Sequence, residues 1–296
     1  MTEILQSLSA LSGRYDAVFC DLWGCLHNGR TAFPAAVAAL QGFRANGGRV
    51  VLLTNAPRPK SSVIAQLDAL GAPRACWDIV VTSGDAAQMG MLSGAVGGKV
   101  HHIGAAKDEV FFTDFAEDLA ALARTQPPIT RVALKDAEGI VCTGLADDLT
   151  ETPDDYRAAF LLAKTLGLPM LCANPDIVVD MGERRLFCAG ALAKAYEDMG
   201  GRTLYFGKPH PPIYDLARRR LSEVSGLADP QILCIGDGIS TDVQGGIAEG
   251  MDTLFVTGGL EAESFGADVE NPDQGLLDAW LAARELSATF AMGRLR

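Results

Sequence analysis

Short apolar runs alternate with helical segments in the first third of the chain, and this alternation constrains the fold more than any other feature. Residues 17–22, 49–54 and 79–82 are apolar runs of strand length. The segments between them, 34–45 and 61–70, have the length and composition of helices. Nearly continuous apolar strands separated by helices are typical of a parallel sheet that is covered on both faces. The pattern therefore predicts an α/β fold with a doubly wound, Rossmann-like sheet.

The last third of the chain repeats this style. Strands are predicted at 202–206, 231–235 and 253–256, with helices at 213–224 and 241–249 between them. Thr241 and Gln244 match a capping box, which predicts a helix start just after Ser240. A final helix is predicted at 276–286. Both ends of the chain are therefore expected to build one sheet.

The middle of the chain has strands and helices of its own. Strands are predicted at 100–103, 131–134 and 139–143, and a helix is predicted to begin at Thr152 and Pro153. A length of 296 residues suits about two domains of ~150 residues. The sequence therefore predicts a core domain, formed by residues 1–83 and 202–296, with a second α/β domain of residues 84–201 inserted into it.

Composition excludes several classes of function. The net charge of −12 argues against non-specific binding of nucleic acid, which favours a basic surface. No apolar stretch approaches the ~18 residues of a membrane span, and the first residues lack the long apolar region of a signal peptide. Seven cysteines without C-x-x-C spacing favour a reduced, cytoplasmic protein with no zinc site.

Polar residues follow the predicted core strands at their C-terminal ends, where open α/β sheets place their ligands. Asp21 follows the first strand, and Thr54 and Asn55 follow the second. Lys208 follows 202–206, and Asp237 follows 231–235, with Asp242 shortly after it. Together these residues supply a nucleophilic carboxylate, groups for an anion, a cation, and a carboxylate pair for a divalent metal.

The segments that carry these residues resemble the four motifs of the haloacid dehalogenase superfamily, in order and spacing. They read DLWGCL, LLTNAPR, FGKPH and IGDGISTD. The insertion between the second and third motifs resembles the C2-type cap of class IIA, whose members are NagD-like and p-nitrophenyl-phosphatase-like. The segment ANPD, at 173–176, is similar to one that is common in that cap. The first motif, Asp-x-Trp-Gly, resembles that of a class IIA subgroup of undefined substrate.

This resemblance implies a Mg²⁺-dependent phosphatase that acts on a small phosphorylated metabolite through an aspartyl-phosphate. Asp21 would be the nucleophile. Mg²⁺ prefers oxygen ligands, which Asp21, Asp237 and the main-chain carbonyl of Trp23 would supply, while Asp242 would bind metal waters or hold Lys208. The substrate stays open between sugar phosphates, nucleotides and flavin-related phosphates, and a homodimer is compatible with the class.

The same resemblance assigns the phosphate-binding groups. The Thr54 hydroxyl and the Asn55 main-chain amide would hold phosphate oxygens. Lys208 would neutralise charge on Asp21 and on the transferring phosphoryl group. Asp176 would reach the substrate from the cap.

Trp23 stands where phosphatases of this superfamily usually carry a second Asp, which protonates the leaving oxygen. Losing general acid–base help costs roughly 10²–10⁴ in rate, or about 3–5 kcal/mol. Three explanations stay open. His27 or Asp176 could supply the proton; the substrate could have a good leaving group, with Trp23 stacked on a flat ring; or the chain could be a catalytically weak protein that binds a phosphorylated ligand. Phosphoryl transfer to an acceptor other than water is a further alternative.

Other motifs favour structural interpretations. The glycine-rich run 93–99 ends in Lys99, but Val100 follows where a nucleotide loop has Ser or Thr, so a cap loop is predicted. Adjacent His101 and His102 would point to opposite faces of a strand and could not share a metal. Cys25 lies near the predicted site, and we expect it to be a packing residue.

Overall fold

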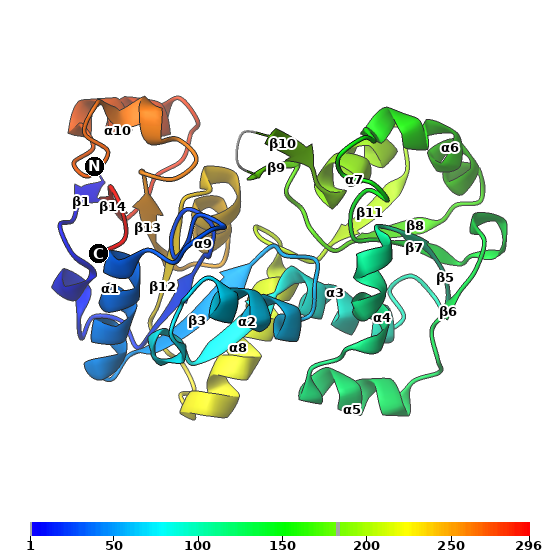
Figure 1. Cartoon of the computed structure of the whole chain (residues 1–296), viewed down its shortest axis with the longest axis horizontal. Coiled ribbons are helices and arrows are strands. Elements are labelled where there is room, and N and C mark those ends of the chain that lie inside the picture. Colours follow the sequence, from blue (N-terminus) through cyan, green and yellow to red (C-terminus); the bar gives the residue numbers. More distant parts are fainter. Residues whose placement is uncertain (1, 182–183) are drawn as a thin grey trace. The chain divides into compact units, whose positions relative to one another are not determined.

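The structure is a computed structural model, which describes residues 2–181 and 184–296. The chain forms two compact units (Figure 1). Unit 1 comprises Met1–Thr54, Ile64–Val81 and Tyr214–Arg296, and unit 2 comprises Asn55–Val63 and Thr82–Ile213. The insertion of one unit within the other agrees in outline with the predicted domains, whose boundaries, at 83/84 and 201/202, stay predictions.

Unit 1 is built on a seven-stranded sheet with the strand order β1-β14-β13-β12-β2-β3-β4. Each neighbouring pair from β1 across to β3 is parallel. The bounds are Glu3–Ile4 for β1, Ala17–Cys20 for β2, Arg49–Thr54 for β3, Ile79–Thr82 for β4, Ile232–Gly236 for β12, Asp252–Val256 for β13 and Phe290–Met292 for β14. Strands β2 to β4 and β12 to β13 are apolar and buried almost throughout, as expected for a sheet covered on both faces.

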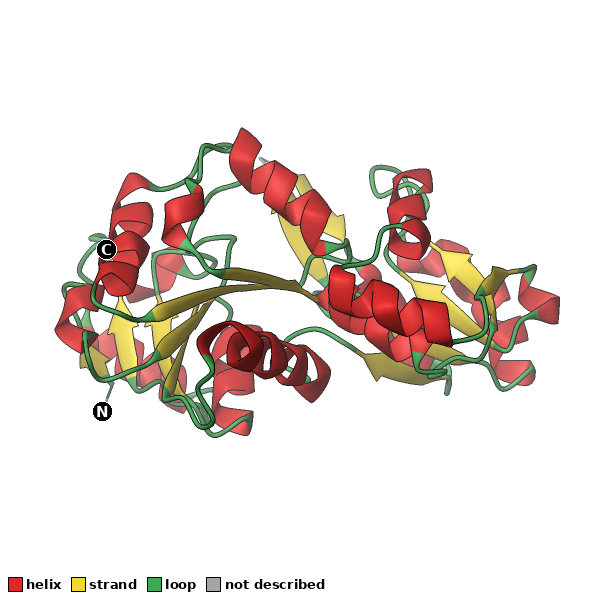
Figure 2. Cartoon of the chain, turned by 90° about the horizontal axis from the view of Figure 1, so that it is seen from below, coloured by secondary structure: helices red, strands yellow, loops and turns green. Residues whose placement is uncertain are grey.

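The sheet reverses its direction of winding between β2 and β12. From β2 the chain adds β3 and β4 on one side, and from β12 it adds β13 and β14 on the other. β2 and β12 are neighbours, with Cys20 opposite Ile235. Helices lie on both sides of the strands (Figure 2). The predicted doubly wound α/β fold is confirmed, and ligands of such sheets bind where the winding reverses.

The helices associated with unit 1 overlap the predicted segments, and only α1 matches its predicted bounds at both ends. α1 spans Pro34–Ala45 as predicted, because Pro34 suits the first helical turn and Gly47, at φ 94°, ends the helix. The remaining bounds are Lys60–Ala69 for α2, Pro211–Ser225 for α8, Gln244–Ala248 for α9 and Gln274–Ala282 for α10. α2 and α8 each cross a boundary between the units.

Unit 2 has a parallel sheet of five strands in the order β11-β8-β7-β5-β6. The strands are Lys99–Ile103 (β5), Thr130–Arg131 (β6), Gly139–Cys142 (β7), Pro169–Cys172 (β8) and Arg202–Tyr205 (β11). β9 (Val178–Met181) and β10 (Arg184–Phe187) form a separate antiparallel pair. The strand predicted at 131–134 is shorter than expected, because a 3₁₀ turn over Leu134–Asp136 follows it.

One strand belongs to a different sheet from the one that the sequence suggested. The strand predicted at 202–206 was placed in the core sheet, but β11 pairs with β8, with Tyr205 opposite Cys172. That placement was wrong. An apolar run specifies a strand but not its partner, which depends on the tertiary fold. Lys208 therefore follows a strand of unit 2.

The helices of unit 2 pack around this sheet. The bounds are Ser83–Leu92 for α3, Val110–Thr113 for α4, Glu117–Thr125 for α5, Arg157–Thr165 for α6 and Ala189–Asp198 for α7. A 3₁₀ turn over Pro153–Tyr156 precedes α6, in agreement with the predicted helix start at Thr152 and Pro153. The Asp155 carboxylate accepts the main-chain N–H of Thr152 over 2.8 Å. Phe160 of α6 packs against Tyr196 of α7 in the core, with ring centroids 5.4 Å apart. Within the described residues, no helix has the length and apolarity needed to cross a membrane.

Candidate active site

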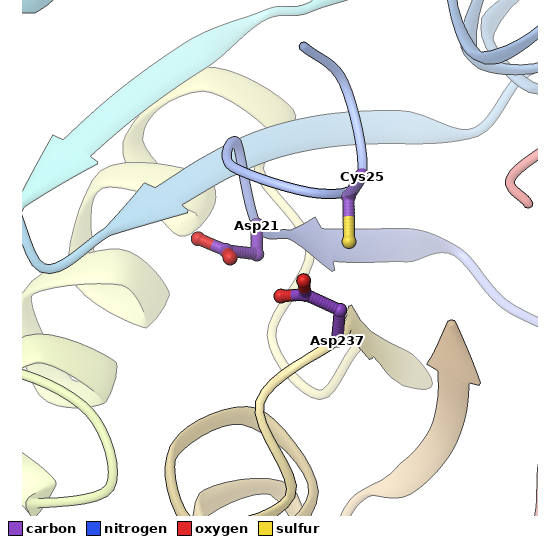
Figure 3. Close-up of side chains that lie close together, drawn as sticks. All are labelled: Asp21, Cys25 and Asp237. Carbon is purple, nitrogen blue, oxygen red and sulfur yellow. The ribbon is translucent and has the colours of Figure 1, made fainter. Parts of the chain in front are cut away.

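Two carboxylates face each other where the sheet of unit 1 reverses its winding. Asp21 follows β2, Asp237 follows β12, and the main-chain N–H of Asp21 donates to the carbonyl of Ile235 over 2.8 Å. Figure 3 shows the two carboxylates close together and extending to the same side, with the Cys25 sulfur beside them. The ligand atoms of all three residues lie within 4.8 Å of one another.

This group of side chains fits a hard divalent cation. Asp21 and Asp237 are 9% and 4% exposed, and two carboxylates held so close in a buried place repel each other unless a cation or proton intervenes. Burial raises the pKa of the Cys25 thiol, and the charges of Asp237 and Asp21 raise it further. The two carboxylates supply oxygen donors, which are the ligands that Mg²⁺ and Ca²⁺ prefer.

The sequence interpretation placed Cys25 near the site but expected it to be a packing residue and did not count it among the ligands. Gly24, however, has a φ of 71°, and this left-handed turn returns the chain toward the strand end. The only sequence signal was the glycine itself, placed between Trp23 and Cys25.

Two glycines enclose the Asp237 carboxylate. A Cβ at Gly24 would lie 1.9 Å from Asp237 Oδ2, and a Cβ at Gly259 would lie 2.0 Å from the same atom. The main-chain N–H of Leu260 donates to Oδ2 over 3.0 Å. Asp237 is therefore held in one place by backbone that only glycine permits, which fixes the carboxylate before any ligand arrives.

Gly259→Ala should displace Asp237 and weaken Mg²⁺ binding by about 10–100-fold, the usual size of a lost support around a metal ligand. Calorimetric titration with MgCl₂ measures this affinity. Gly42→Ala is the matched control, because a Cβ at Gly42 meets nothing within 4 Å. Equal Mg²⁺ affinities in the two variants would contradict the assignment of Asp237 as a metal ligand.

Asp242 lies against the same strand end. A Cβ at Gly236 would come within 2.0 Å of Asp242 Cγ, and the carboxylate accepts hydrogen bonds from the Gly238 N–H at 3.2 Å and the Thr241 hydroxyl at 3.3 Å. The predicted capping box of Thr241 was wrong. A π-helical turn over Ile239–Val243 precedes α9, and Gly238, with no side-chain cap, begins it. The Asp242 carboxylate takes the N–H that a cap would have satisfied.

Trp23 lies beside this site with part of its surface in solvent. The side chain is 36% exposed. Its ring packs on Gly29, where a Cβ would lie 2.2 Å from the indole, and meets the His27 ring edge-on, with centroids 5.3 Å apart at 72°. The indole is thus fixed by its neighbours and is not part of the buried core.

His27 is a poor substitute for a missing proton donor. It is 1% exposed, and its Nδ1 accepts the main-chain N–H of Gly29 over 3.1 Å, which requires that nitrogen to be unprotonated. Burial lowers the pKa of His27, and the charge of Asp21 only partly opposes this. The neutral, anchored ring shapes the loop that carries Trp23.

The other predicted site residues divide between the units. Thr54 ends β3 in unit 1 and is 5% exposed, and the boundary between the units falls directly after it. Asn55, Asp176 and Lys208 come together within unit 2. The Asn55 side-chain amide accepts a hydrogen bond from the Lys208 N–H (2.7 Å). It donates to the Lys208 carbonyl (3.1 Å) and to the Asp176 carboxylate (2.8 Å). The predicted place of Lys208 next to Asp21 stays a prediction.

Two further residues lie next to this second group: Asn174, which belongs to the quoted segment ANPD, and Ser83, which the sequence interpretation did not name. The Asn174 side chain accepts the N–H of Asp176 over 2.9 Å and so shapes the loop 173–176. The Ser83 hydroxyl, fully buried, lies within hydrogen-bond distance of the carbonyls of Ala173 at 2.6 Å and Ala56 at 3.0 Å, which share its single hydrogen. The ANPD segment was the sequence feature that pointed to Asn174. No sequence feature indicated a role for Ser83.

The glycine-rich loop is filled by the protein itself. Glu138 accepts the main-chain N–H groups of Gly98 and Lys99 over 2.7 Å and 3.1 Å, and these bonds lower the pKa of its carboxyl. An internal carboxylate thus occupies the place where a nucleotide loop would bind phosphate.

Comparison with known proteins identifies the family. A model described as haloacid dehalogenase-like hydrolase matches residues 18–116, and one described as HAD-hydrolase-like matches residues 205–279. The crystal structure of a haloacid dehalogenase-like hydrolase from Brucella suis 1330 is 39% identical, with a TM-score of 0.83, over 99% of this chain and 100% of that one. The chain belongs to the haloacid dehalogenase-like hydrolase family.

Relatives with named activities are phosphatases. The ribonucleotide monophosphatase NagD of Escherichia coli K12 is 25% identical over 253 residues, which cover 83% of this chain and 88% of NagD. The glycerol phosphate phosphatase of Mycobacterium tuberculosis, solved with magnesium, is 26% identical with a TM-score of 0.62, over 89% of this chain and 74% of that one. The predictions of a NagD-like member of this family, and of a phosphoric monoester hydrolase, are confirmed at that level.

Proposed function

We propose that the chain is a Mg²⁺-dependent phosphatase that hydrolyses a small phosphorylated metabolite through an aspartyl-phosphate on Asp21. The observation that carries this proposal is the pair of buried carboxylates, Asp21 and Asp237, facing each other at the strand ends where the sheet reverses. A single carboxylate there would suit a helix cap or a turn. Two of them, one enclosed by glycines, suit an ion and an anionic substrate.

The proposed reaction has two displacements at phosphorus. An Asp21 oxygen attacks the phosphorus, the bond to the leaving oxygen breaks, and the phosphoryl group is carried as a mixed anhydride. Water then attacks the same phosphorus, which releases inorganic phosphate and restores the carboxylate. The divalent ion, bound by Asp21 and Asp237 with the Trp23 carbonyl and Asp242 as further candidates, would neutralise the charge of the phosphoryl oxygens.

The remaining roles are assigned by the matching motifs. Thr54 and the main-chain amide of Asn55 bind phosphate oxygens, and Lys208 neutralises the charge that builds up during transfer. Asp176 contacts the substrate or supplies a proton. The support from the structure is local, since Asn55, Asp176 and Lys208 are bonded to one another within unit 2.

The substrate is proposed to be a metabolite with an intact phosphomonoester. Relatives that act on ribonucleotides and glycerol phosphate support this size class. Sugar phosphates, nucleotides and flavin-related phosphates are the candidates for a first screen. Trp23 adds one preference, because an exposed, fixed indole stacks well on a flat ring in the substrate.

A catalytically weak protein that binds a phosphorylated ligand is the second candidate function. The observation that favours it is local to the loop 23–29: Trp23 cannot donate a proton at neutral pH, and the His27 ring is buried with Nδ1 engaged. In this case the site would bind phosphate and metal while turnover stays low. Transfer of the phosphoryl group to an alcohol instead of water is a variant of the first proposal, which product analysis with added alcohols detects.

The deciding experiment traps the phosphoenzyme. Purified protein is mixed with Mg²⁺ and a panel of aryl, acyl, sugar and nucleotide phosphates, quenched in acid and assayed for a hydroxylamine-labile phosphoryl group. EDTA should abolish the signal and MgCl₂ should restore it, because the facing carboxylates need a cation between them. If no substrate labels the protein while Mg²⁺-dependent binding of inorganic phosphate persists, the binding function is correct instead.

A further inference from the structure

The side chain of Asn55 is directed at the protein itself. Oδ1 accepts the main-chain N–H of Lys208 over 2.7 Å, and Nδ2 donates to the Lys208 carbonyl over 3.1 Å and to Asp176 Oδ1 over 2.8 Å. Both donors of the amide are thereby used. The side chain is 5% exposed, so it is built into unit 2 and is not a free ligand for phosphate.

These three bonds fix the orientation of the amide. If Oδ1 and Nδ2 exchanged places, an oxygen would face both the Lys208 carbonyl and the Asp176 carboxylate, and the NH₂ group would face the Lys208 N–H. Gly207 makes the close approach possible, since a Cβ there would lie 2.4 Å from Asn55 Oδ1. Gly207, the glycine of the FGKPH motif, therefore makes room for the side chain of Asn55, which belongs to the LLTNAPR motif.

We infer that Asn55 is a positioning residue, which fixes the main chain of Lys208 at both its N–H and its carbonyl and ties it to Asp176. This inference rests on the proposed function, in which Lys208 balances the charge of the phosphoryl group. Lys208 is 3% exposed. A long side chain acts at a defined point only when the main chain from which it starts is held, and a shift of ~1 Å in a catalytic group costs about 10²-fold in rate.

Ser83 provides the matched control. Its hydroxyl lies within hydrogen-bond distance of the carbonyls of Ala173 and Ala56, and its Cβ lies close to Gly207. Ser83 therefore contacts the same part of unit 2 as Asn55. No hydrogen bond of Ser83 that the structure describes goes to Lys208. If Asn55 only stabilised this part of unit 2, Asn55→Ala and Ser83→Ala would have similar consequences.

The test is a double-mutant cycle on single-turnover phosphoenzyme formation with p-nitrophenyl phosphate and Mg²⁺. Asn55→Ala should lower the rate about 10²-fold with little change in KM, whereas Ser83→Ala should stay within about threefold of the unmodified chain. In a Lys208→Ala background, Asn55→Ala should change the rate by less than about twofold, because a residue that acts through Lys208 has nothing left to position. Asn55→Asp, which keeps the size and loses both donors, should behave like Asn55→Ala and covers the case in which the alanine variant does not fold.

Multiplicative effects of Asn55→Ala and Lys208→Ala would overturn the inference, and so would equal losses in Asn55→Ala and Ser83→Ala. The same cycle is run on the Kd of inorganic phosphate with Mg²⁺, measured by calorimetry, which needs no turnover. If the unmodified chain forms no phosphoenzyme, the proposed function fails. The binding cycle then still decides on Asn55, since non-additive weakening supports the positioning role and additive weakening rejects it.

Discussion

Replacing Asp21 with asparagine is expected to lower phosphoenzyme formation by on the order of 10⁵–10⁶-fold, the usual consequence of losing a nucleophile. The amide oxygen of asparagine is neutral and cannot form a stable bond to phosphorus. The change also removes one of the two facing carboxylates, so Mg²⁺ affinity should fall. The measurement is the acid-quenched, single-turnover assay with p-nitrophenyl phosphate, run at saturating Mg²⁺ to separate the two effects.

Asp16→Asn is the control for this variant. Asp16 lies at the opposite end of the same strand, β2, where its carboxylate accepts the main-chain N–H of Gln231 over 2.8 Å. An asparagine oxygen can accept that bond equally, so the charge change is matched and the strand is kept. We expect activity within about twofold of the unmodified chain. Residual phosphoenzyme in Asp21→Asn, or a comparable loss in Asp16→Asn, would show that another residue is the nucleophile.

Five strands of the sheet of unit 1, β2, β3, β4, β12 and β13, could be predicted from the local sequence, whereas the short strands β1 and β14 were not predicted. The runs 49–54 and 79–82 match β3 and β4 residue for residue. They are continuous and apolar, with Asn-Gly-Gly before one and the close of a helix before the other, so the hydrophobic pattern and the turn residues agree. Where the two agree, the local sequence determines the bounds of the strand whatever its tertiary partners are.

Pairing was the part that local sequence could not supply. β11 has the composition of a core strand, yet it extends the sheet of unit 2. The β9–β10 pair was not predicted either. Its strands, Val178–Met181 and Arg184–Phe187, mix apolar and charged residues. Which edge a strand joins depends on neighbours that are distant in sequence.

The same limit applies to the site. Asp21 and Asp237 were predicted to meet because parallel strands end at one edge, and a rule about strand ends needs no side-chain detail. The positions of the Cys25 sulfur and the Asn55 amide depend on the local course of the backbone. The left-handed conformation of Gly24 returns the chain so that Cys25 lies near the carboxylates. The absence of a side chain at Gly207 leaves room for the Asn55 amide. A sequence shows these glycines but not what they make room for.

Trp23→Asp is expected to accelerate hydrolysis of the phosphoenzyme, by up to roughly 10²–10⁴-fold, which is the usual worth of a general base placed beside the attacking water. The indole occupies the position that carries a carboxylate in similar phosphatases. Its environment tolerates the change, because Trp23 is 36% exposed and its ring contacts are with His27 and Gly29. Chase experiments on pre-formed phosphoenzyme measure the step directly.

The effect on the leaving group separates the explanations for Trp23. Without a proton donor, phosphoenzyme formation should slow steeply as the pKa of the leaving alcohol rises across a series of aryl and alkyl phosphates. Trp23→Asp should flatten that dependence, because the new carboxyl can protonate the departing oxygen. Trp23→Phe removes the indole without adding an acid, so it should keep the steep dependence. If both variants instead lose activity toward ring-bearing phosphates alone, the indole binds the substrate, and the tryptophan is part of the site's specificity.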